Sequence, residues 1–262
     1  MSSAQATQHA ATALARLYDL DLSEDPGDVE LYRALARRTG DPIVELAVGT
    51  GRVAAVLAAD GHKVVGVDND PAMLARARGR EVGDRLRLVD ADLLAAPTLD
   101  AVVAGGPYNL AIIALNSILL LASAERQRAA LVSMAGLLWP GGVAVVDAWQ
   151  PSPTDLVAFD GRLSLEWLRT DPETGREVTK TVAAWLDPAT RLVTLTTIFD
   201  EGEPGQPPVR WTRSDALRLV TVDELASYAE AAGLVVEQLA GDYALGPLDA
   251  GSDRVVLIAR KA

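Results

Sequence analysis

The residues best suited to chemistry lie at a glycine turn that follows an apolar run. Residues 45–52 read Glu-Leu-Ala-Val-Gly-Thr-Gly-Arg, so Gly49 and Gly51 separate a predicted buried strand from a predicted helix. Open α/β sheets bind ligands at such strand ends, and glycine lets the backbone approach a ligand that any Cβ would push away. The turn therefore predicts a nucleotide site. It also fits the fingerprint of nicotinamide dinucleotides, because Ala54 can replace the third glycine of that pattern.

Two carboxylates accompany this turn. Asp68 ends the next apolar run, about 20 residues after the glycines, where a carboxylate can accept both ribose hydroxyls of an adenosine. The alternative is that Asp68 only caps the helix predicted to begin at Pro71. Glu45 is an acid within an apolar strand, which is costly unless a cation or a hydrogen-bond donor lies nearby. Neighbouring backbone N–H groups are the alternative partners for Glu45.

Four segments together resemble the successive motifs of class I S-adenosylmethionine-dependent methyltransferases. They are residues 45–52, residues 66–74 (Gly-Val-Asp-Asn-Asp-Pro-Ala-Met-Leu), residues 91–93 (Ala-Asp-Leu) and residues 114–117 (Ala-Leu-Asn-Ser). Tyr18-Asp19 and residues 241–243 (Gly-Asp-Tyr) are similar to the small-molecule branch of that family, which carries an antiparallel lid. The resemblance implies S-adenosyl-L-methionine as cofactor. It also implies an enzyme that transfers a methyl group to a nitrogen or oxygen of a small-molecule acceptor.

The resemblance assigns roles to individual residues. Glu45 would hold the amino-acid part of the cofactor, Asp92 the adenine amino group and the N–H of Leu93 a ring nitrogen, with Asp90 as a competitor for Asp92. Met73 would lie on the adenine face, although a methionine at helical spacing also suits core packing. The expected cofactor-binding residues are Tyr18, Glu45, Ala47, Gly49, Gly51, Arg52, Asp68, Asn69, Met73, Asp92, Leu93, Ala114 and Asn116. Val48 and the segment Pro107-Tyr108-Asn109 depart from the family pattern.

The predicted reaction needs no nucleophilic residue. The chain has no cysteine and no convincing Ser/His/Asp arrangement, and in-line methyl transfer can rely on orientation and exclusion of water. An amine or hydroxyl acceptor must still lose a proton. The catalytic residue is unknown, with Tyr18, Asp147 and Asp242 as weak candidates by position. For Asn116, which interrupts an aliphatic run, a capping role competes with a substrate contact.

The elements that must position these residues follow from hydrophobic runs. Strands are predicted at Ile43–Val48, Lys63–Val67, Leu86–Val89, Leu110–Ala114 and Val143–Asp147, with helices at Arg52–Ala59, Pro71–Gly79 and Ala124–Leu138 between them. Later strands are predicted at Ser164–Arg169, Glu177–Leu186, Arg191–Phe199 and Val209–Leu219, then a helix at Val222–Ala232 and strands at Leu234–Leu239 and Arg254–Ala259.

The predicted fold is an α/β Rossmann-like, seven-stranded, mostly parallel sheet with helices on both faces and an antiparallel β insertion between its fifth strand and last helix. The corresponding domains are an N-terminal helical cover at 1–40, a cofactor-binding core at 41–150, a lid at 151–219 and a completing helix with two strands at 220–262.

Composition limits the partners. A formal charge of −12 opposes binding to nucleic acid, and two histidines without cysteine give no reason to expect a metal. The most apolar stretch, Leu110–Ala122, is too short to span a bilayer, so we expect a cytoplasmic protein without a membrane partner. A homodimer remains open. The alternatives are an NAD(P)-dependent oxidoreductase or a cofactor-binding protein without catalysis.

Overall fold

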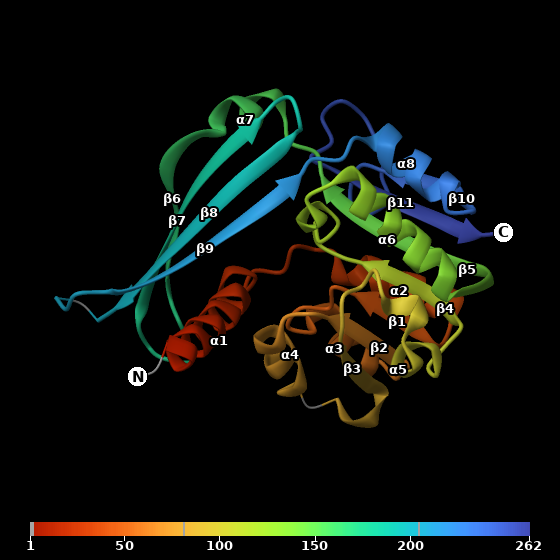
Figure 1. Cartoon of the computed structure of the whole chain (residues 1–262), viewed down its shortest axis with the longest axis horizontal. Coiled ribbons are helices and arrows are strands. Elements are labelled where there is room, and N and C mark those ends of the chain that lie inside the picture. Colours follow the sequence, from red (N-terminus) through yellow and green to blue (C-terminus); the bar gives the residue numbers. More distant parts are fainter. Residues whose placement is uncertain (1–2, 81, 204) are drawn as a thin grey trace. The chain divides into compact units, whose positions relative to one another are not determined.

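The computed structural model describes residues 3–80, 82–203 and 205–262 (Figure 1). The chain divides into two compact units. The larger combines Asp25–Gln150 with Val220–Ala262, and the smaller combines the chain up to Glu24 with Pro151–Leu219. The division at Glu24 places the first two helices of the chain in different units.

The larger unit is built on a seven-stranded sheet of order β10-β11-β5-β4-β1-β2-β3. Its strands are β1 (Ile43–Leu46), β2 (Val64–Asp68), β3 (Leu86–Asp90), β4 (Tyr108–Ile113), β5 (Leu138–Trp149), β10 (Leu234–Ala240) and β11 (Arg254–Lys261). The pairs from β3 to β5 are parallel, and β11 runs antiparallel to both β5 and β10. The strand order reverses at β1, between β2 and β4, and open sheets of this kind bind ligands at such a reversal.

Some helices of the larger unit begin at side-chain caps. The helices of this unit are α2 (Val29–Thr39), α3 (Arg52–Ala59), α4 (Pro71–Arg78), α5 (Asp100–Val103), α6 (Ala124–Leu137) and α8 (Val222–Ala231). Ser123 accepts a backbone hydrogen bond at the start of α6, and Thr221 forms a capping box with Glu224 at the start of α8. Each cap replaces a partner that the first helical N–H groups lack.

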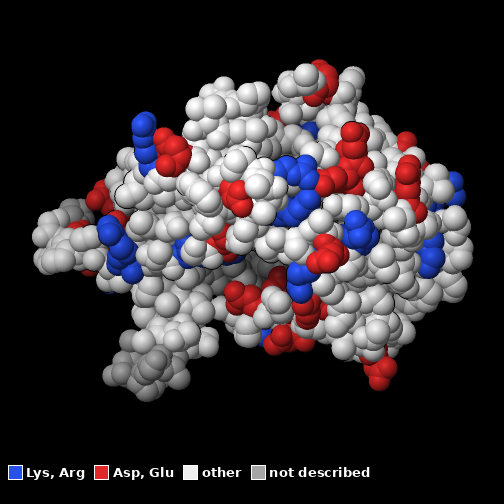
Figure 2. Space-filling view, turned by 45° about the horizontal axis from the view of Figure 1, so that its top comes forward, with Lys and Arg blue, Asp and Glu red and all other residues white. Residues whose placement is uncertain are grey.

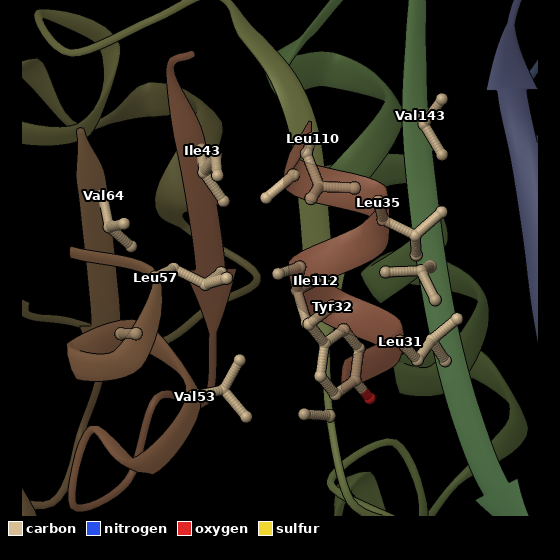
Figure 3. Close-up of a cluster of buried hydrophobic side chains, with 14 of the residues drawn as sticks. Leu31, Tyr32, Leu35, Ile43, Val53, Leu57, Val64, Leu110, Ile112 and Val143 are labelled. Carbon is tan, nitrogen blue, oxygen red and sulfur yellow. The ribbon is translucent and has the colours of Figure 1, made fainter. Parts of the chain in front are cut away.

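The core of this unit lies where α2 and α3 pack against the central strands. Figure 3 shows Leu31, Tyr32 and Leu35 of α2 over Ile112 of β4 and Val143 of β5, all of them buried. Burying each such side chain contributes about 1.5–3 kcal/mol. Because strand side chains alternate between faces, the intervening residues of β4 and β5 point to the opposite face, where α6 packs on both strands. The sheet is therefore covered on both sides.

The smaller unit is a four-stranded antiparallel sheet of order β6-β7-β8-β9 with helix α1 packed on it. Its elements are α1 (Ser3–Asp21), α7 (Pro153–Ala158), β6 (Asp160–Thr170), β7 (Glu177–Asp187), β8 (Leu192–Gly202) and β9 (Val209–Arg218). Leu17 and Leu20 of α1 form a buried cluster with Val178 and Phe199. Trp167 and Trp211 pack against this cluster, which makes them packing residues of the sheet.

Ion pairs also fasten α1 to this sheet. Arg16 pairs with the buried Asp171, and its Nη2 lies 2.7 Å from Oε2 of the buried Glu201. On the same sheet Arg210 and Arg213 pair with Asp200 and Asp215, respectively. The two arginines are therefore engaged with neighbouring acids.

The predicted fold class is confirmed, with the sheet and the antiparallel insertion in the expected order. The short helices α5 and α7 lie in segments where no helix was predicted. At α7, Ser152 and Asp155 form a capping box that stabilises one and a half turns without an apolar periodicity. The hydrophobic pattern carries no signal for so short a helix.

Two surface properties bear on partners. Among the residues described here, no helix combines the length and the apolar character needed to cross a membrane. On the face drawn in Figure 2, basic side chains are interspersed with acidic ones rather than gathered into an extended basic surface.

Candidate functional site

The glycine turn between β1 and α3 leaves open space in front of its backbone. Gly49 has a φ of 55° and Gly51 a φ of 76°, in the left-handed region that favours glycine. A Cβ built on Gly51 would lie 3.1 Å from Cβ of Ala77 in α4, whereas a Cβ on Gly49 would meet no heavy atom within 4 Å. Gly51 is thus required by packing. Gly49 faces space that a ligand can fill.

Asp68 is held at the end of β2 by two backbone donors. The N–H of Gly49 donates to its Oδ2 at 2.7 Å, and the N–H of Asp70 donates to its Oδ1 at 2.9 Å. Burial raises the pKa of the Asp68 carboxyl, and these hydrogen bonds, together with one from the backbone N–H of Asn69, oppose that rise. Each carboxylate oxygen can accept a second hydrogen bond, so the pair can take two hydroxyl donors.

The alternative role for Asp68 as a helix cap is wrong. Asp70 is the N-cap of α4, because its Oδ1 accepts from the N–H groups of Ala72 at 2.8 Å and Met73 at 3.2 Å. Pro71 occupies the first helical turn, where its missing N–H costs nothing. Asp68 is therefore left for the turn and for whatever the turn binds.

Glu45 is a buried carboxyl with one oxygen that lacks a partner. It is 3% exposed, and its Oε2 has no hydrogen-bond partner among the described residues. The backbone N–H of Ala54 bonds the carboxyl, so the alternative of backbone partners holds for only part of the group. Burial raises the pKa of Glu45 to about 8, against the lowering effect of Arg52. An unpartnered buried oxygen is costly and suits a cationic ligand.

Arg52 and Asp28 form a bidentate ion pair beside Glu45. Nη1 of Arg52 lies 2.7 Å from Oδ1 of Asp28, and Nη2 lies 2.5 Å from Oδ2. Asp28 is fully buried at the N-cap position of α2, yet its side chain makes no capping hydrogen bond there. Sequence reasoning missed Asp28, because an aspartate just ahead of a helix reads as a cap.

Asp147 is an internal anchor. It is fully buried in β5, and its Oδ1 accepts from the hydroxyl of Tyr32 at 2.5 Å and the N–H of Leu115 at 2.7 Å. Its Oδ2 accepts from the hydroxyl of Tyr243 at 3.0 Å, and Arg254 lies beyond that hydroxyl, with Nη1 3.6 Å from the same oxygen. Burial raises the pKa of Asp147, opposed by these hydrogen bonds. Both oxygens are occupied, which argues against Asp147 as a base.

The turn after β4 is strained and tied to β5. Leu115 and Asn116 have φ values of 48° and 65°, and such conformations in residues other than glycine cluster at functional sites. The N–H of Trp149 donates to Oδ1 of Asn116 at 2.6 Å. The Asn116 amide therefore joins the ends of two strands, and its oxygen points to Trp149.

The remaining predicted residues of the larger unit vary in their surroundings. Met73 is 8% exposed in the first turn of α4. Oδ1 of Asp92 accepts from the N–H of Leu94, and its Oδ2 lies 3.1 Å from Nη2 of Arg126. The carbonyl of Leu93 accepts from the hydroxyl of Ser133. Their predicted roles toward an adenine stay predictions, as do those of Ala47, Asn69 and Ala114, which lie at the ends of β1, β2 and β4.

The other two candidate bases are Asp242 and Tyr18. Asp242 is exposed and accepts from the N–H of Gly246 within its own loop. Tyr18 belongs to α1 in the smaller unit, and its role toward the cofactor stays a prediction.

Comparison with known proteins identifies the class of this domain. A family model described as a methyltransferase domain matches residues 43–142. Ribosomal RNA small subunit methyltransferase A of Anaeromyxobacter dehalogenans (strain 2CP-C) is 44% identical over 63 residues, which are 24% of this chain and 22% of that protein. The chain spans between 22% and 49% of the length of the curated relatives it matches.

Solved structures match over nearly the whole chain. The CcbJ methyltransferase from Streptomyces caelestis has a TM-score of 0.75 and 25% identity, covering 92% of this chain and 98% of its own. An amino pentose methyltransferase from Micromonospora echinaspora, solved with S-adenosylmethionine bound, has a TM-score of 0.70 and 22% identity, covering 94% and 97%. This second likeness concerns the fold.

Proposed function

We propose that this chain, whose residues 43–142 match a family model described as a methyltransferase domain, is an S-adenosylmethionine-dependent methyltransferase that methylates a nitrogen or oxygen of a small-molecule acceptor. The single observation that carries the proposal is the pairing of Asp68 with the turn at Gly49. This pairing sets a carboxylate with spare acceptor capacity beside open space at the strand reversal.

The residues present fit the cofactor. Asp68 would accept the ribose hydroxyls, and the unpartnered Oε2 of Glu45 would accept from the ammonium of the methionine part. A nicotinamide dinucleotide has no ammonium to offer Glu45. Met73 and Asp92 would lie at the adenine. When bound, the cofactor supplies a methyl group on a positively charged sulfur, and the chain needs no nucleophile of its own.

The contribution of the protein would be orientation. The strained turn at Leu115 and Asn116 is fixed by Asp147 and Trp149, so the end of β4 presents a rigid backbone. A rigid site that aligns the lone pair of the acceptor with the methyl group and excludes water can supply about 7–11 kcal/mol of the barrier reduction. The proton of the acceptor then passes to a base that the geometry leaves unassigned among Tyr18, Asp242 and solvent.

The smaller unit carries exposed apolar side chains. Its sheet carries Leu163, Leu165, Leu168 and Trp185, each more than half exposed, and apolar surface of this kind suits the body of a small organic acceptor. One structural neighbour is an amino pentose methyltransferase, which supports an amino sugar as the first acceptor to test. The net charge of −12 supports a neutral or cationic acceptor over a nucleic acid.

The test combines binding with turnover. Calorimetric titration of the whole chain should show saturable binding of S-adenosylhomocysteine and none of NAD. Incubation with S-adenosylmethionine and a panel of amino sugars, followed by mass spectrometry, should show a gain of one methyl group on an acceptor. Saturable NAD binding without a response to S-adenosylhomocysteine would overturn the proposal in favour of an oxidoreductase. Cofactor binding without turnover on any acceptor offered would favour a non-catalytic binding protein.

A further inference from the structure

We propose that Asp28 is a positioning residue of the cofactor site: by holding Arg52, it leaves the free oxygen of Glu45 open to the ammonium of the cofactor. The inference rests on the proposed function, since it concerns how that cofactor is captured. Nothing in the sequence pattern or in the comparisons assigns Asp28 a role.

The side chain of Asp28 is engaged by Arg52. It is fully buried, and a buried carboxylate is costly unless it is paired. Both of its oxygens accept from Arg52, at 2.7 and 2.5 Å, in the fork geometry that is strongest for this pair. Although it stands at the N-cap of α2, it makes no side-chain hydrogen bond to the helix. Capping therefore does not account for it.

Charge explains why Arg52 must be held. The charged groups that act on Glu45 are Arg52 on α3, Asp28 ahead of α2 and Asp68 at the end of β2. Arg52 is the cation among them, and its attraction already lowers the pKa of the Glu45 carboxyl. A guanidinium released from Asp28 would move toward Oε2 of Glu45, because that oxygen is buried and unpartnered among the described residues. It would then occupy the place of the cofactor's ammonium.

The arrangement couples binding of the cofactor to release of a proton from Glu45. With Arg52 engaged, burial keeps the pKa of Glu45 at about 8, so without cofactor the carboxyl is protonated near neutral pH. An ammonium within hydrogen-bond reach favours the carboxylate. As the cofactor binds, the O–H bond of Glu45 breaks, the carboxylate stays with the ammonium, and the proton passes to the buffer.

The first experiment measures this proton on the wild-type chain. S-adenosylhomocysteine is titrated calorimetrically at about pH 7 in two buffers with different ionisation enthalpies, which gives the number of protons released. We expect close to one proton per bound ligand, and none for Glu45→Gln. Infrared difference spectra should show loss of the protonated carboxyl stretch on binding in the wild type alone. Binding without proton release, or release that persists in Glu45→Gln, would overturn the coupling.

The second experiment tests Asp28 itself. Asp28→Asn should lower the affinity for S-adenosylhomocysteine at least tenfold and reduce proton release, because the freed Arg52 ionises Glu45 before the ligand arrives. The double variant Asp28→Asn with Arg52→Gln should bind S-adenosylhomocysteine more tightly than Asp28→Asn alone, since no cation then competes for Glu45. Asp25→Asn, an exposed aspartate in the same loop, is the matched control and should bind as the wild type does.

The outcomes separate this inference from the proposed function. Unchanged affinity in Asp28→Asn, or a double variant that binds no better than the single one, would reduce Asp28 to a structural residue while the cofactor assignment stands. A wild-type chain that does not bind S-adenosylhomocysteine would overturn the proposed function instead. If Asp28→Asn does not melt cooperatively, the double variant, which has no unpaired charge at either position, carries the test together with the wild-type proton count.

Discussion

Replacing Glu45 with glutamine should stabilise the cofactor-free protein at neutral pH. The pKa of Glu45 is about 8 in the folded protein, against 4.5 for the same side chain exposed to solvent. Below about pH 4.5 both states are protonated, so the carboxyl then contributes no pH-dependent cost. Between pH 4.5 and pH 8 the unfolded chain is ionised while the folded chain keeps the proton. The free energy of unfolding therefore falls by about 1.36 kcal/mol for each pH unit in this range.

The expected magnitude follows from this interval. Between pH 4.5 and pH 7 the free energy of unfolding falls by about 3 kcal/mol. Glutamine stays neutral in both states and still offers an oxygen to the N–H of Ala54, but it buries an extra N–H. The free energy of unfolding of Glu45→Gln should therefore exceed that of the wild type by about 2–3 kcal/mol at pH 7, and the difference should shrink to near zero at about pH 4.5.

Urea unfolding at constant ionic strength across this pH range is the assay. Glu30→Gln is the matched control, because the side chain of Glu30 on α2 is 71% exposed and its ion pair with Arg33 lies at the surface. Its effect should stay within about 0.5 kcal/mol at every pH. If Glu45→Gln is the less stable protein at pH 7, or if its effect does not change with pH, then Glu45 is ionised in the folded state and the reasoning is refuted.

Three further substitutions test the site. Asp68→Ala should weaken S-adenosylhomocysteine binding by about 2–4 kcal/mol, roughly 30- to 900-fold, through two lost hydrogen bonds to a charged group. Calorimetry should show no change for the exposed control Asp84→Asn. An unchanged affinity in Asp68→Ala would remove that residue from the site. Gly49→Ala should cost about 1 kcal/mol of stability, because Gly49 has a positive φ. It should also lower the affinity for S-adenosylhomocysteine at least tenfold, because the added Cβ would meet only the ligand. An unchanged affinity in calorimetry would show that the cofactor does not fill this space. Asp147→Ala should destabilise the fold by about 3–5 kcal/mol in urea, since it strips a buried hydroxyl and N–H of their acceptor, and Asp147→Asn by less; equal stabilities would contradict an anchoring role.

The site residues that could be predicted from the sequence are those that lie within or next to a predicted strand. Glu45 lies within β1, Gly49 and Gly51 follow that strand closely, and Asp68 ends β2, so the hydrophobic period that reveals each strand also locates these residues. Whether Asp68 binds a ribose or caps the next helix could not be decided that way. Asp68 and Asp70 are both acids just ahead of a helix, and only the folded hydrogen bonds show that Asp70 caps α4.

Residues that act through distant partners left no such signal. Asp28 lies 24 positions before Arg52, and no local pattern joins an aspartate ahead of one helix to the first residue of the next. Asp147 was predicted to end its strand, whereas β5 continues to Trp149. Its partners come from α2, from the turn after β4 and from the segment before β11. Three chain segments that converge on one buried carboxylate cannot be read from spacing, and a buried anchor and a catalytic base look alike in sequence.

Helix α2 connects these two sets of contacts. Asp28 stands at its N-cap and Tyr32 lies four residues further on, one helical turn along the same face. The N–H of Tyr32 donates to the carbonyl of Asp28 at 3.3 Å, while the Tyr32 hydroxyl donates to Asp147. One end of this turn fixes the guanidinium beside Glu45, and the other fixes the carboxylate that holds Leu115. The start of α2 therefore sets both the charge beside Glu45 and the position of the strained turn after β4. A displacement of that single helical turn would disturb both sites together, because a hydrogen bond of the same turn joins Asp28 to Tyr32.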